Sequence, residues 1–212
     1  MIGGSAMPET PSDLVLSLFG DQQGKVVQFT ELLAAEGSLR GLIGPREADR
    51  IWSRHIVNSA AVLPFLPAKG TVADVGSGAG LPGLVVACAR PELEVFLVEP
   101  MVRRCEWLRY ASEKIGLSNV TVIRERAENL DKSFKVNAVT ARAVRRLNEL
   151  VPLTARLLAP KGCLLALKGQ RAGEEVRDAH SELAKFQLNA RVHEVVSVMD
   201  GEVTYVVQCC RK

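Results

Sequence analysis

From residue 71 onward, short apolar runs alternate with longer amphipathic stretches. Ten or more residues with helical spacing separate the first several runs, which is the pattern of a parallel sheet covered by helices on both faces. The last two runs differ, because a short segment with an Asp-Gly turn joins them into an antiparallel hairpin. We therefore expect a seven-stranded, mostly parallel sheet with the strands Thr71–Val75, Glu94–Val98, Val120–Ile123, Val136–Thr140, Cys163–Leu167, Arg191–Val198 and Val203–Cys209.

The segment before this alternation has helical spacing. Ser12 can cap a first helix, and apolar residues recur at helical intervals from about Gln22 until Gly37 can end a second. Pro45 follows a loop and opens a third helical run. We divide the chain into a flexible N-terminus at 1–11, a helical extension at 12–66 and an α/β domain at 67–212.

Composition excludes several classes of protein. A chain of 212 residues can bury roughly 70% of its unfolded surface in one core. The longest nearly apolar stretch, Leu81–Ala89, is about half of the ~20 residues that a membrane-spanning helix needs, and no secretory signal is visible. We expect a cytoplasmic protein that binds neither membrane nor metal. With no C-x-x-C pair, we expect reduced, structural thiols at Cys88, Cys105, Cys163, Cys209 and Cys210.

A glycine-rich turn, Asp74–Gly83, joins the first strand of the sheet to a helix. Glycines at such a turn let the backbone approach a ligand above the helix N-terminus, and we expect Ser77 and Gly78 to take part. The stretch Gly78–Gly83 satisfies the dinucleotide pattern G-x-G-x-x-G, and Glu99 follows where a ribose-binding acid belongs. An oxidoreductase that binds NAD is therefore one alternative.

The charge at the turn favours another cofactor. Asp74 lies two residues before Gly76, where a carboxylate would repel a pyrophosphate but suits the ammonium and sulfonium groups of S-adenosylmethionine. Glu99 can accept hydrogen bonds from ribose hydroxyls with either cofactor. After the third strand, Ala127 and Glu128 fall where an adenine would lie. We expect S-adenosylmethionine as the cofactor.

The segment after the fourth strand, Thr140–Arg146, indicates the substrate. It has no Asn-Pro-Pro-Tyr motif for exocyclic amines and no Pro-Cys motif for attack on a pyrimidine. What remains is a nucleophile that needs no deprotonation, such as guanine N7. Residues 101–146 also carry eleven Lys or Arg against five Asp or Glu, an excess that indicates a polyanionic partner.

An ordered set of motifs over about residues 45 to 170 resembles the glucose-inhibited division protein B family, bacterial methyltransferases that act on guanine N7 in 16S ribosomal RNA. These motifs are Arg54–Ser59, Asp74–Gly83, Arg126–Glu128, Ala141–Ala143 and Leu167–Gly169. The resemblance implies a Rossmann-like class I methyltransferase fold with an N-terminal helical extension, and 16S ribosomal RNA or the small ribosomal subunit as partner. It also implies that the cofactor contacts Gly76, Leu81, Ala127, Glu128 and Arg142.

The sequence departs from the family pattern in two places. The usual Asn-Leu-Thr segment is absent around residues 40–44, and Asn58 stands where the family commonly has Asp. Any role that needs a negative charge at position 58 is therefore open.

Candidate substrate-binding residues lie in the motifs and in the basic segment. Arg54 and Asn58 share one helix face, although the neighbouring His55 can equally serve helix packing. We expect Arg142 and Lys168 to act in catalysis by orienting the base, although Lys168 can also be a solvated strand-end lysine. Trp52 and Trp107 lie on apolar helix faces and are expected in the core. The full set expected to bind RNA is Arg54, His55, Asn58, Arg103, Arg104, Arg145, Arg146 and Lys168.

The sequence thus predicts a monomeric enzyme that methylates guanine N7 in ribosomal RNA. A small-molecule methyltransferase is the first alternative, although it would not need the basic segment. The NAD-binding oxidoreductase and a catalytically silent RNA-binding module are the others.

Overall fold

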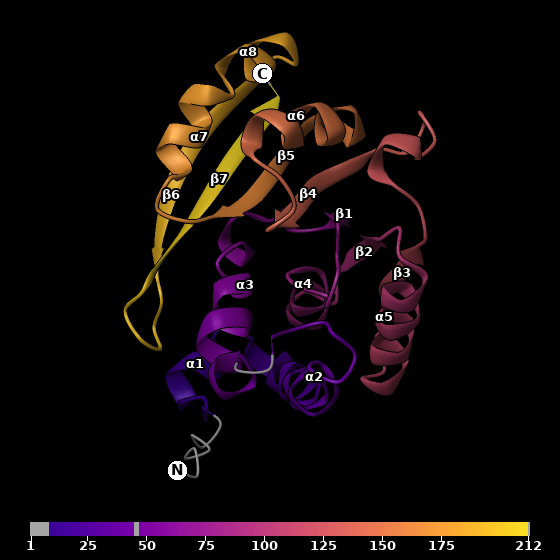
Figure 1. Ribbon diagram of the computed structural model, residues 1–212, viewed down its shortest axis with the longest axis vertical. Helices are drawn as coiled ribbons and strands as arrows, with labels where there is room; N and C mark the ends of the chain where they lie inside the picture. The colour runs from indigo at the N-terminus through magenta and orange to yellow at the C-terminus, as the bar shows by residue number, and fades with distance from the viewer. Residues whose placement is uncertain (1–8, 45–46, 212) are drawn as a thin grey trace.

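In a computed structural model, which describes residues 9–44 and 47–211, the chain folds around a seven-stranded sheet (Figure 1). The strand order is β3-β2-β1-β4-β5-β7-β6, with β1 to β5 parallel and β7 antiparallel to both β5 and β6. The predicted sheet with its hairpin is confirmed. The strands are β1 Gly70–Val75, β2 Leu93–Val98, β3 Val120–Ile123, β4 Val136–Arg142, β5 Leu158–Lys168, β6 Leu188–Val196 and β7 Val203–Arg211.

Two strands begin three or more residues earlier than predicted. β5 begins at Leu158 rather than Cys163, and β6 begins at Leu188 rather than Arg191. The first part of β5 contains a Pro and a Gly, and its pairing with β4 shifts register between Val136 and Ala138. An irregular strand of this kind lacks the continuous apolar run on which the prediction depended.

Helices precede the sheet and alternate with its strands. The α-helices are α1 Asp13–Ser17, α2 Gln23–Glu36, α3 Asn58–Ala60, α4 Gly83–Ala89, α5 Val102–Lys114, α6 Leu147–Thr154, α7 Ala172–Asp178 and α8 His180–Lys185. Shorter 3-10 turns are η1 Gly20–Gln22, η2 Ala48–Arg50, η4 Leu63–Phe65, η5 Ala127–Asn129 and η6 Ala155–Leu157, and η3 Trp52–Val57 is a π-helix. Within the described ranges, none of these helices has the length and apolar character to cross a bilayer.

The N-terminal segment is helical, as its spacing predicted. Ser12 caps α1 by accepting a hydrogen bond from the Val15 N–H at 3.4 Å, and α2 ends just before Gly37. The third helical run passes from η2 through η3 into α3. Pro45, expected at its start, lies outside the described residues, as do residues 1–8 of the expected flexible N-terminus. The division of the chain at residues 66 and 67 stays a prediction.

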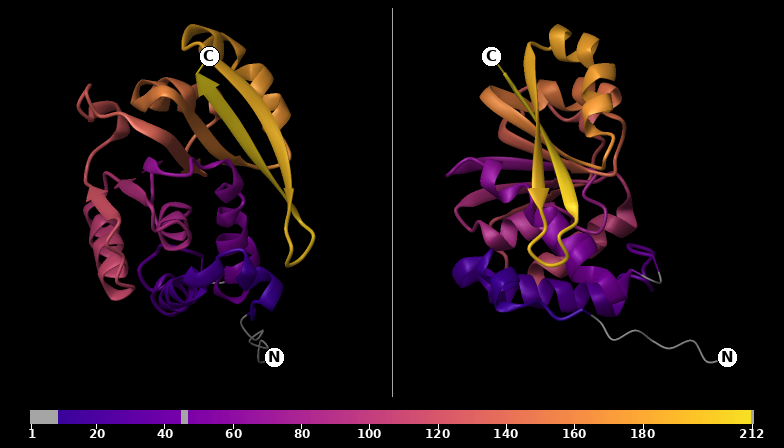
Figure 2. Two further views of the ribbon diagram at one scale, coloured as in Figure 1. Left: turned by 180° about the vertical axis from the view of Figure 1, so that it is seen from behind. Right: turned by 90° about the vertical axis from the view of Figure 1, so that its left-hand side faces the viewer.

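Two hydrophobic cores lie on opposite faces of the sheet. Neighbouring residues of β1 show the alternation, because Val72 belongs to one core and Ala73 to the other. Helices α1 to α5 cover the first face and α6 to α8 the second (Figures 1 and 2). Trp52 and Trp107 are buried in the first core, which confirms their prediction. Because both faces are covered, the carboxyl edge of the sheet is the place for a ligand.

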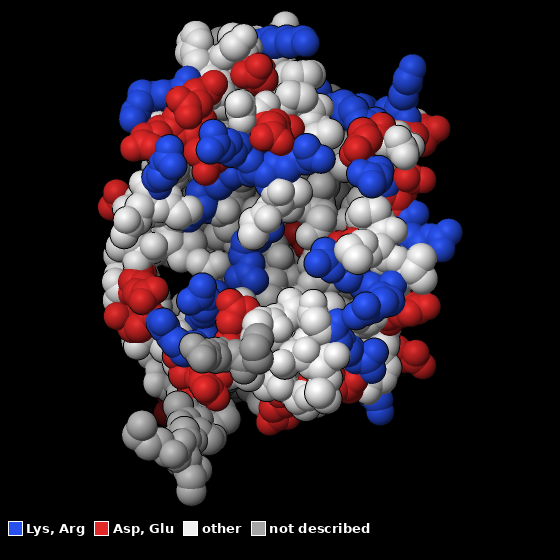
Figure 3. Space-filling view, viewed as in Figure 1, with Lys and Arg blue, Asp and Glu red and all other residues white. Residues whose placement is uncertain are grey.

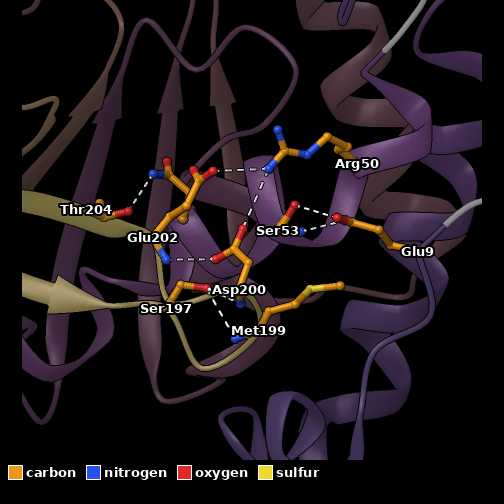
Figure 4. Close-up of polar contacts among 9 residues, drawn as sticks. Glu9, Arg50, Ser53, Ser197, Met199, Asp200, Glu202 and Thr204 are labelled. Carbon is orange, nitrogen blue, oxygen red and sulfur yellow. Dashed lines mark hydrogen bonds and ion pairs between the residues drawn. The ribbon is translucent and has the colours of Figure 1, made fainter.

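The β6–β7 hairpin extends beyond the sheet to the N-terminal helices (Figure 2). At its tip, the Arg50 Nη2 lies 3.3 Å from Glu202 Oε1 and 3.7 Å from Asp200 Oδ2 (Figure 4). Further along β7, the Thr204 hydroxyl accepts a hydrogen bond from Asn58 Nδ2 at 2.8 Å. The hairpin is therefore fastened to the helical segment that carries the Arg54–Ser59 motif.

Two of the five cysteines form a disulfide. Cys163 of β5 and Cys210 of β7 are register partners, with their Cα atoms 4.1 Å apart. The prediction of reduced thiols is wrong for this pair, because the hairpin returns β7 alongside β5 and chain spacing does not reveal that pairing. Cys88, Cys105 and Cys209 are free and buried.

Candidate active site

The glycine-rich turn is a compact left-handed backbone segment between β1 and α4. Gly76, Gly78 and Gly80 have φ angles of 71°, 54° and 96°, a region that favours glycine. The Gly76 N–H donates to the Val98 carbonyl at 2.8 Å, which ties the turn to the end of β2. A Cβ added at Gly76 would lie only 2.9 Å from a methyl carbon of Val144. The turn has no room for a side chain at this point.

Asp74 lies beneath the turn and is almost fully buried. Its Oδ1 accepts from the Thr140 hydroxyl at 2.8 Å, and its Oδ2 accepts from the Gly83 N–H at 3.1 Å. Burial raises the pKa of this carboxyl to about 6, although the hydrogen bonds oppose the rise. Asp74 is not among the residues that line the cavity beside the turn. It supports the turn from below, and its direct contact with a cofactor stays a prediction.

A cavity of about 420 Å³ lies beside the turn, at the carboxyl ends of β1, β2 and β4. The structure brings together here the other residues expected to bind the cofactor: Gly76, Ser77, Gly78, Leu81, Glu99, Ala127, Glu128 and Arg142. Ligands of open α/β sheets bind at this edge, so the cavity is the candidate cofactor site.

Glu99 is the fixed acid of this cavity. Its Oε2 accepts from the Gly78 N–H at 3.0 Å, and its Oε1 accepts from the Met101 N–H at 2.9 Å. The Arg104 guanidinium lies 3.8 Å from Oε2. Each carboxylate oxygen has capacity for another donor, such as a ribose hydroxyl. The glycine turn, this acid and the short turn at Ala127 together fit a cofactor that contains adenosine.

Arg142, at the end of β4, is held by acceptors from one helical segment. Its Nη1 donates to the Arg54 carbonyl and to Asn58 Oδ1, both at 3.3 Å, and its Nη2 lies 3.1 Å from His55 Nδ1. Asn58 serves through its neutral carbonyl oxygen, because its amide nitrogen donates to Thr204. Position 58 therefore holds Arg142 without the negative charge that the family commonly has there.

His55 and Glu47 support the position of Arg142 through a series of contacts. An arginine can only donate, so His55 Nδ1 accepts and the neutral ring carries its proton on Nε2. That Nε2 lies 3.5 Å from Glu47 Oε2, and Oε2 also accepts from the Gly44 N–H at 2.8 Å. Burial and the charge of Arg142 together lower the pKa of His55 to about 4, although Glu47 partly opposes them. Sequence reasoning missed Glu47 and Thr204, because neither belongs to a motif.

A second cavity, of about 520 Å³, shares the segment Arg142–Arg145 with the first. Asn58, Arg146 and Lys168, all expected to bind substrate, line it. The Lys168 ammonium is nevertheless engaged, because it lies 2.7 Å from Glu175 Oε2 and donates to the Arg145 carbonyl at 2.6 Å. Contact of Lys168 with substrate stays a prediction.

The remaining basic residues surround these cavities. Arg103 and Arg104 line a third hollow, and Arg103 donates to the Arg40 carbonyl at 3.0 Å. The Arg54 side chain is exposed and pairs with Glu47. Figure 3 shows Lys and Arg side chains on both sides of a hollow in the face viewed there. His55 is buried, so the structure gives it the task of holding Arg142, and RNA contact by it is untested.

The chain matches known proteins over most of its length. Residues 22–203 match the family GidB, described as rRNA small subunit methyltransferase G. A ribosomal RNA small subunit methyltransferase G of Beutenbergia cavernae is 52% identical over 192 residues, which cover 90% of this chain and 91% of that protein. One of Acidothermus cellulolyticus is 51% identical over 189 residues, which cover 88% of this chain and 84% of that protein.

Solved structures share the fold at low sequence identity. A SAM-dependent methyltransferase from Aquifex aeolicus aligns with a TM-score of 0.59 at 18% identity, over 83% of this chain and 98% of that chain. M. jannaschii TYW2 in complex with AdoMet aligns with a TM-score of 0.60 at 16% identity, over 75% of this chain and 76% of that chain. The predicted Rossmann-like methyltransferase fold is confirmed. From the family match and the relatives that share about half of its residues, we conclude that the chain belongs to the rRNA small subunit methyltransferase G family.

Proposed function

We propose that this chain transfers a methyl group from S-adenosylmethionine to N7 of a guanine in 16S ribosomal RNA. The observation that carries the proposal is the pair of cavities that meet at Arg142–Arg145. The cavity beside the glycine turn fits the cofactor, and the second cavity admits a base next to it. Family membership makes the RNA of the small ribosomal subunit the substrate class.

The chemistry asks the chain for positioning rather than for proton transfer. When bound, S-adenosylmethionine supplies a methyl group that the N7 lone pair takes as the carbon–sulfur bond breaks, leaving its electron pair on sulfur. N7 carries no proton at neutral pH, so no residue has to act as a general base. Correct placement of the reacting atoms can supply several kcal/mol of the required barrier reduction. Glu99 and the glycine turn would hold the cofactor, and Arg142 would orient the base.

Arg142 is suited to that task by its free donors. Three of its guanidinium hydrogens face Arg54, Asn58 and His55. Within residues 9–44 and 47–211, its Nε–H and one Nη2 hydrogen have no acceptor, and Arg142 lines both cavities. These two hydrogens can donate to guanine O6 or to a neighbouring phosphate and leave the N7 lone pair free.

The alternatives that the sequence left open lose their support. Membership of an rRNA methyltransferase family disfavours both an NAD-binding oxidoreductase and a silent RNA-binding module. A small-molecule methyltransferase would not need the arginines that border the cavities. We further propose that the enzyme acts as a monomer in the cytoplasm and without a metal, since neutral N7 needs no Lewis acid. Light scattering and activity after chelation test the first and last points.

Methylation of defined RNA tests the proposed function. Small ribosomal subunits and naked 16S RNA that lack the modification are incubated with the protein and labelled S-adenosylmethionine. We expect 7-methylguanosine at one guanine, detected by chemical cleavage and mass spectrometry, and we expect calorimetry to show no binding of NAD. Methylation at another atom, or no methylation of either RNA, would contradict the proposal.

A further inference from the structure

The second cavity contains a single acidic residue among its described lining residues. Arg142, Arg145, Arg146 and Lys168 supply positive charge to its wall, and Glu175 of α7 is the exception. The motif set of the family resemblance does not include Glu175. A carboxylate in a basic cavity is the feature that demands an explanation.

The contacts of Glu175 leave one of its oxygens free. Its Oε2 accepts from the Leu147 N–H at 2.8 Å and lies 2.7 Å from the Lys168 ammonium. Its Oε1 has no partner among the described residues, and about a quarter of the side chain is exposed. The backbone amide and the lysine therefore hold the carboxylate in place, while one oxygen can still accept a hydrogen bond.

The chemistry of the base supplies the matching donors. Guanine carries an N1–H and an N2 amine on the edge away from N7, whereas adenine has an acceptor at N1. Methylation of N7 also moves a positive charge from sulfur to the purine. Arginine or lysine beside the ring opposes that charge, and a carboxylate on the N1 edge stabilises it more in the transition state than in the ground state.

We propose that Glu175 determines the specificity for guanine by accepting, at its free Oε1, a hydrogen bond from the N1–H and N2 amine edge of the base in the second cavity. The inference rests on the proposed function and deepens it, because it assigns the residue that distinguishes guanine from adenine. In this placement N7 faces the first cavity and the N1 edge faces Glu175, and the base lies along the segment Arg142–Arg145 that the two cavities share. The same placement leaves O6 available to Arg142.

A purely structural role predicts different behaviour. If Glu175 only joined α7 to β5 through Lys168, its loss would lower stability and leave nucleotide selectivity unchanged. Glu175→Gln keeps the shape of the side chain but removes its charge. It also replaces one carboxylate oxygen, which accepts hydrogen bonds, with an NH2 group, which donates them. Glu174→Gln is the matched control, because Glu174 is the adjacent acid, is exposed and pairs with Arg171 instead.

The first experiment measures nucleotide binding without turnover. Calorimetry on the full chain with S-adenosylhomocysteine compares 7-methylguanosine monophosphate with adenosine monophosphate at mildly acidic pH, where N1 keeps its proton. We expect the methylated guanine nucleotide to bind at least tenfold more tightly. Glu175→Gln should remove that preference, and Glu174→Gln should retain it. Equal selectivity in Glu175→Gln and the unchanged protein would overturn the proposal.

The second experiment measures single-turnover methylation at saturating RNA. Glu175→Gln should lower the rate at least tenfold with unchanged affinity for S-adenosylhomocysteine, and Glu174→Gln should stay within twofold. A Glu175→Gln rate within twofold of the unchanged protein would also overturn the proposal. Failure of the unchanged protein to methylate ribosomal RNA would contradict the proposed function alone, since the nucleotide titration then decides the role of Glu175 by itself.

Discussion

At the scale of single residues, Arg142 and Arg145 are the charged side chains that line both cavities, and Arg142 is the one held by the Arg54–Ser59 motif. Its three acceptors come from residues 54, 55 and 58 of one helical segment, so its direction is set before any ligand arrives. Burial lowers the pKa of Arg142 to about 10, which leaves the guanidinium charged at neutral pH. A preorganised cation of this kind can orient a base at little entropic cost.

The first prediction concerns the planar shape of this side chain. Arg142→Lys keeps the charge, but one ammonium cannot serve three acceptors and still present a two-donor edge. We expect both Arg142→Lys and Arg142→Ala to lower single-turnover methyl transfer at least about tenfold, equivalent to ~1.4 kcal/mol of transition-state stabilisation. Rapid-quench kinetics with labelled cofactor measure this effect. A near-normal rate in Arg142→Ala would show that Arg142 does not orient the base.

The second prediction uses two glycines with similar backbone. Gly76 and Gly201 have φ angles of 71° and 75°, so alanine costs a comparable ~1–2 kcal/mol at each. Only at Gly76 would the new Cβ meet Val144 beside the cofactor cavity, whereas Gly201 faces open space. Gly76→Ala should weaken binding of S-adenosylhomocysteine at least tenfold in calorimetry, and Gly201→Ala should not. Equal affinities in the two variants would exclude the turn as the cofactor site.

The third prediction concerns pH and His55. The unfolded chain protonates His55 below about pH 6.5, but the folded chain does so only near pH 4, because burial and Arg142 disfavour the charge while Glu47 partly offsets them. His55 therefore contributes stability that is lost as pH falls through this window. Asp74 changes the stability in the opposite direction as pH falls, because folding raises its pKa. The contribution of His55 is therefore measured as the difference in unfolding free energy between the unchanged protein and a variant that lacks His55.

Asparagine at position 55 retains an acceptor near Nδ1 and does not titrate. His55→Asn should reduce the slope of unfolding free energy against pH by up to about 1.4 kcal/mol per pH unit between pH 6.5 and 4. Urea unfolding at several pH values measures the slope. If both proteins have the same slope, folding does not lower the pKa of His55, and a buried neutral His55 is contradicted.

At the scale of elements, the π-helix η3 and the hairpin jointly hold the cationic centre. Helical segments with π geometry are frequent at functional sites, and here η3 presents the Arg54 carbonyl and the His55 ring to Arg142. The next residue in the chain of contacts is Asn58, whose amide is oriented by Thr204 of β7. Elements from opposite ends of the chain therefore meet at Arg142.

The fourth prediction separates this contact from the rest of the hairpin. Thr204→Val preserves the shape of the side chain but leaves the Asn58 amide free to rotate, so methyl transfer should fall severalfold with unchanged cofactor affinity. Glu202→Gln removes an exposed ion pair with Arg50 and should change stability by less than ~1 kcal/mol and activity hardly at all. Single-turnover kinetics and urea unfolding measure the two effects. Equal activity of the two variants would show that the hairpin does not position Arg142.

Sequence reasoning reached the regular elements and missed what depends on tertiary contact. The alternation of apolar runs predicted the sheet, because each parallel strand is buried on both faces and leaves a continuous apolar stretch. The glycine turn and Glu99 were found because each directly follows a strand. Glu47 and Glu175 carry no local pattern, and the Cys163–Cys210 bond depends on a strand pairing 47 residues apart in sequence.

At the scale of the whole molecule, positive charge borders the cavities at the carboxyl edge of the sheet. Arg103 and Arg104 follow β2, and Arg145 and Arg146 follow β4. A phosphate backbone that crosses this edge would meet all four side chains.

The fifth prediction tests this surface by its salt dependence. If Arg103 and Arg104 bind phosphates, the double change to alanine should make the slope of log affinity against log salt shallower by about one unit for each phosphate that is no longer bound. Lys69 and Lys135 are exposed and directly precede β1 and β4, so they lie at the opposite edge of the sheet. Their double change to alanine is the control and should leave the slope unchanged. Equal slopes for the two double variants would show that RNA does not bind at Arg103 and Arg104.

The hairpin that fastens Asn58 also sets the order in which the enzyme becomes competent during its own synthesis. β7 leaves the ribosome after every other strand, yet it inserts between β5 and β6 and carries Thr204. Until it docks, β6 has no neighbouring strand, β5 is paired only with β4, and Asn58 lacks the contact that orients it towards Arg142. The support of Arg142 is therefore completed only once the last strand of the sheet has folded back against the helical segment that carries Asn58.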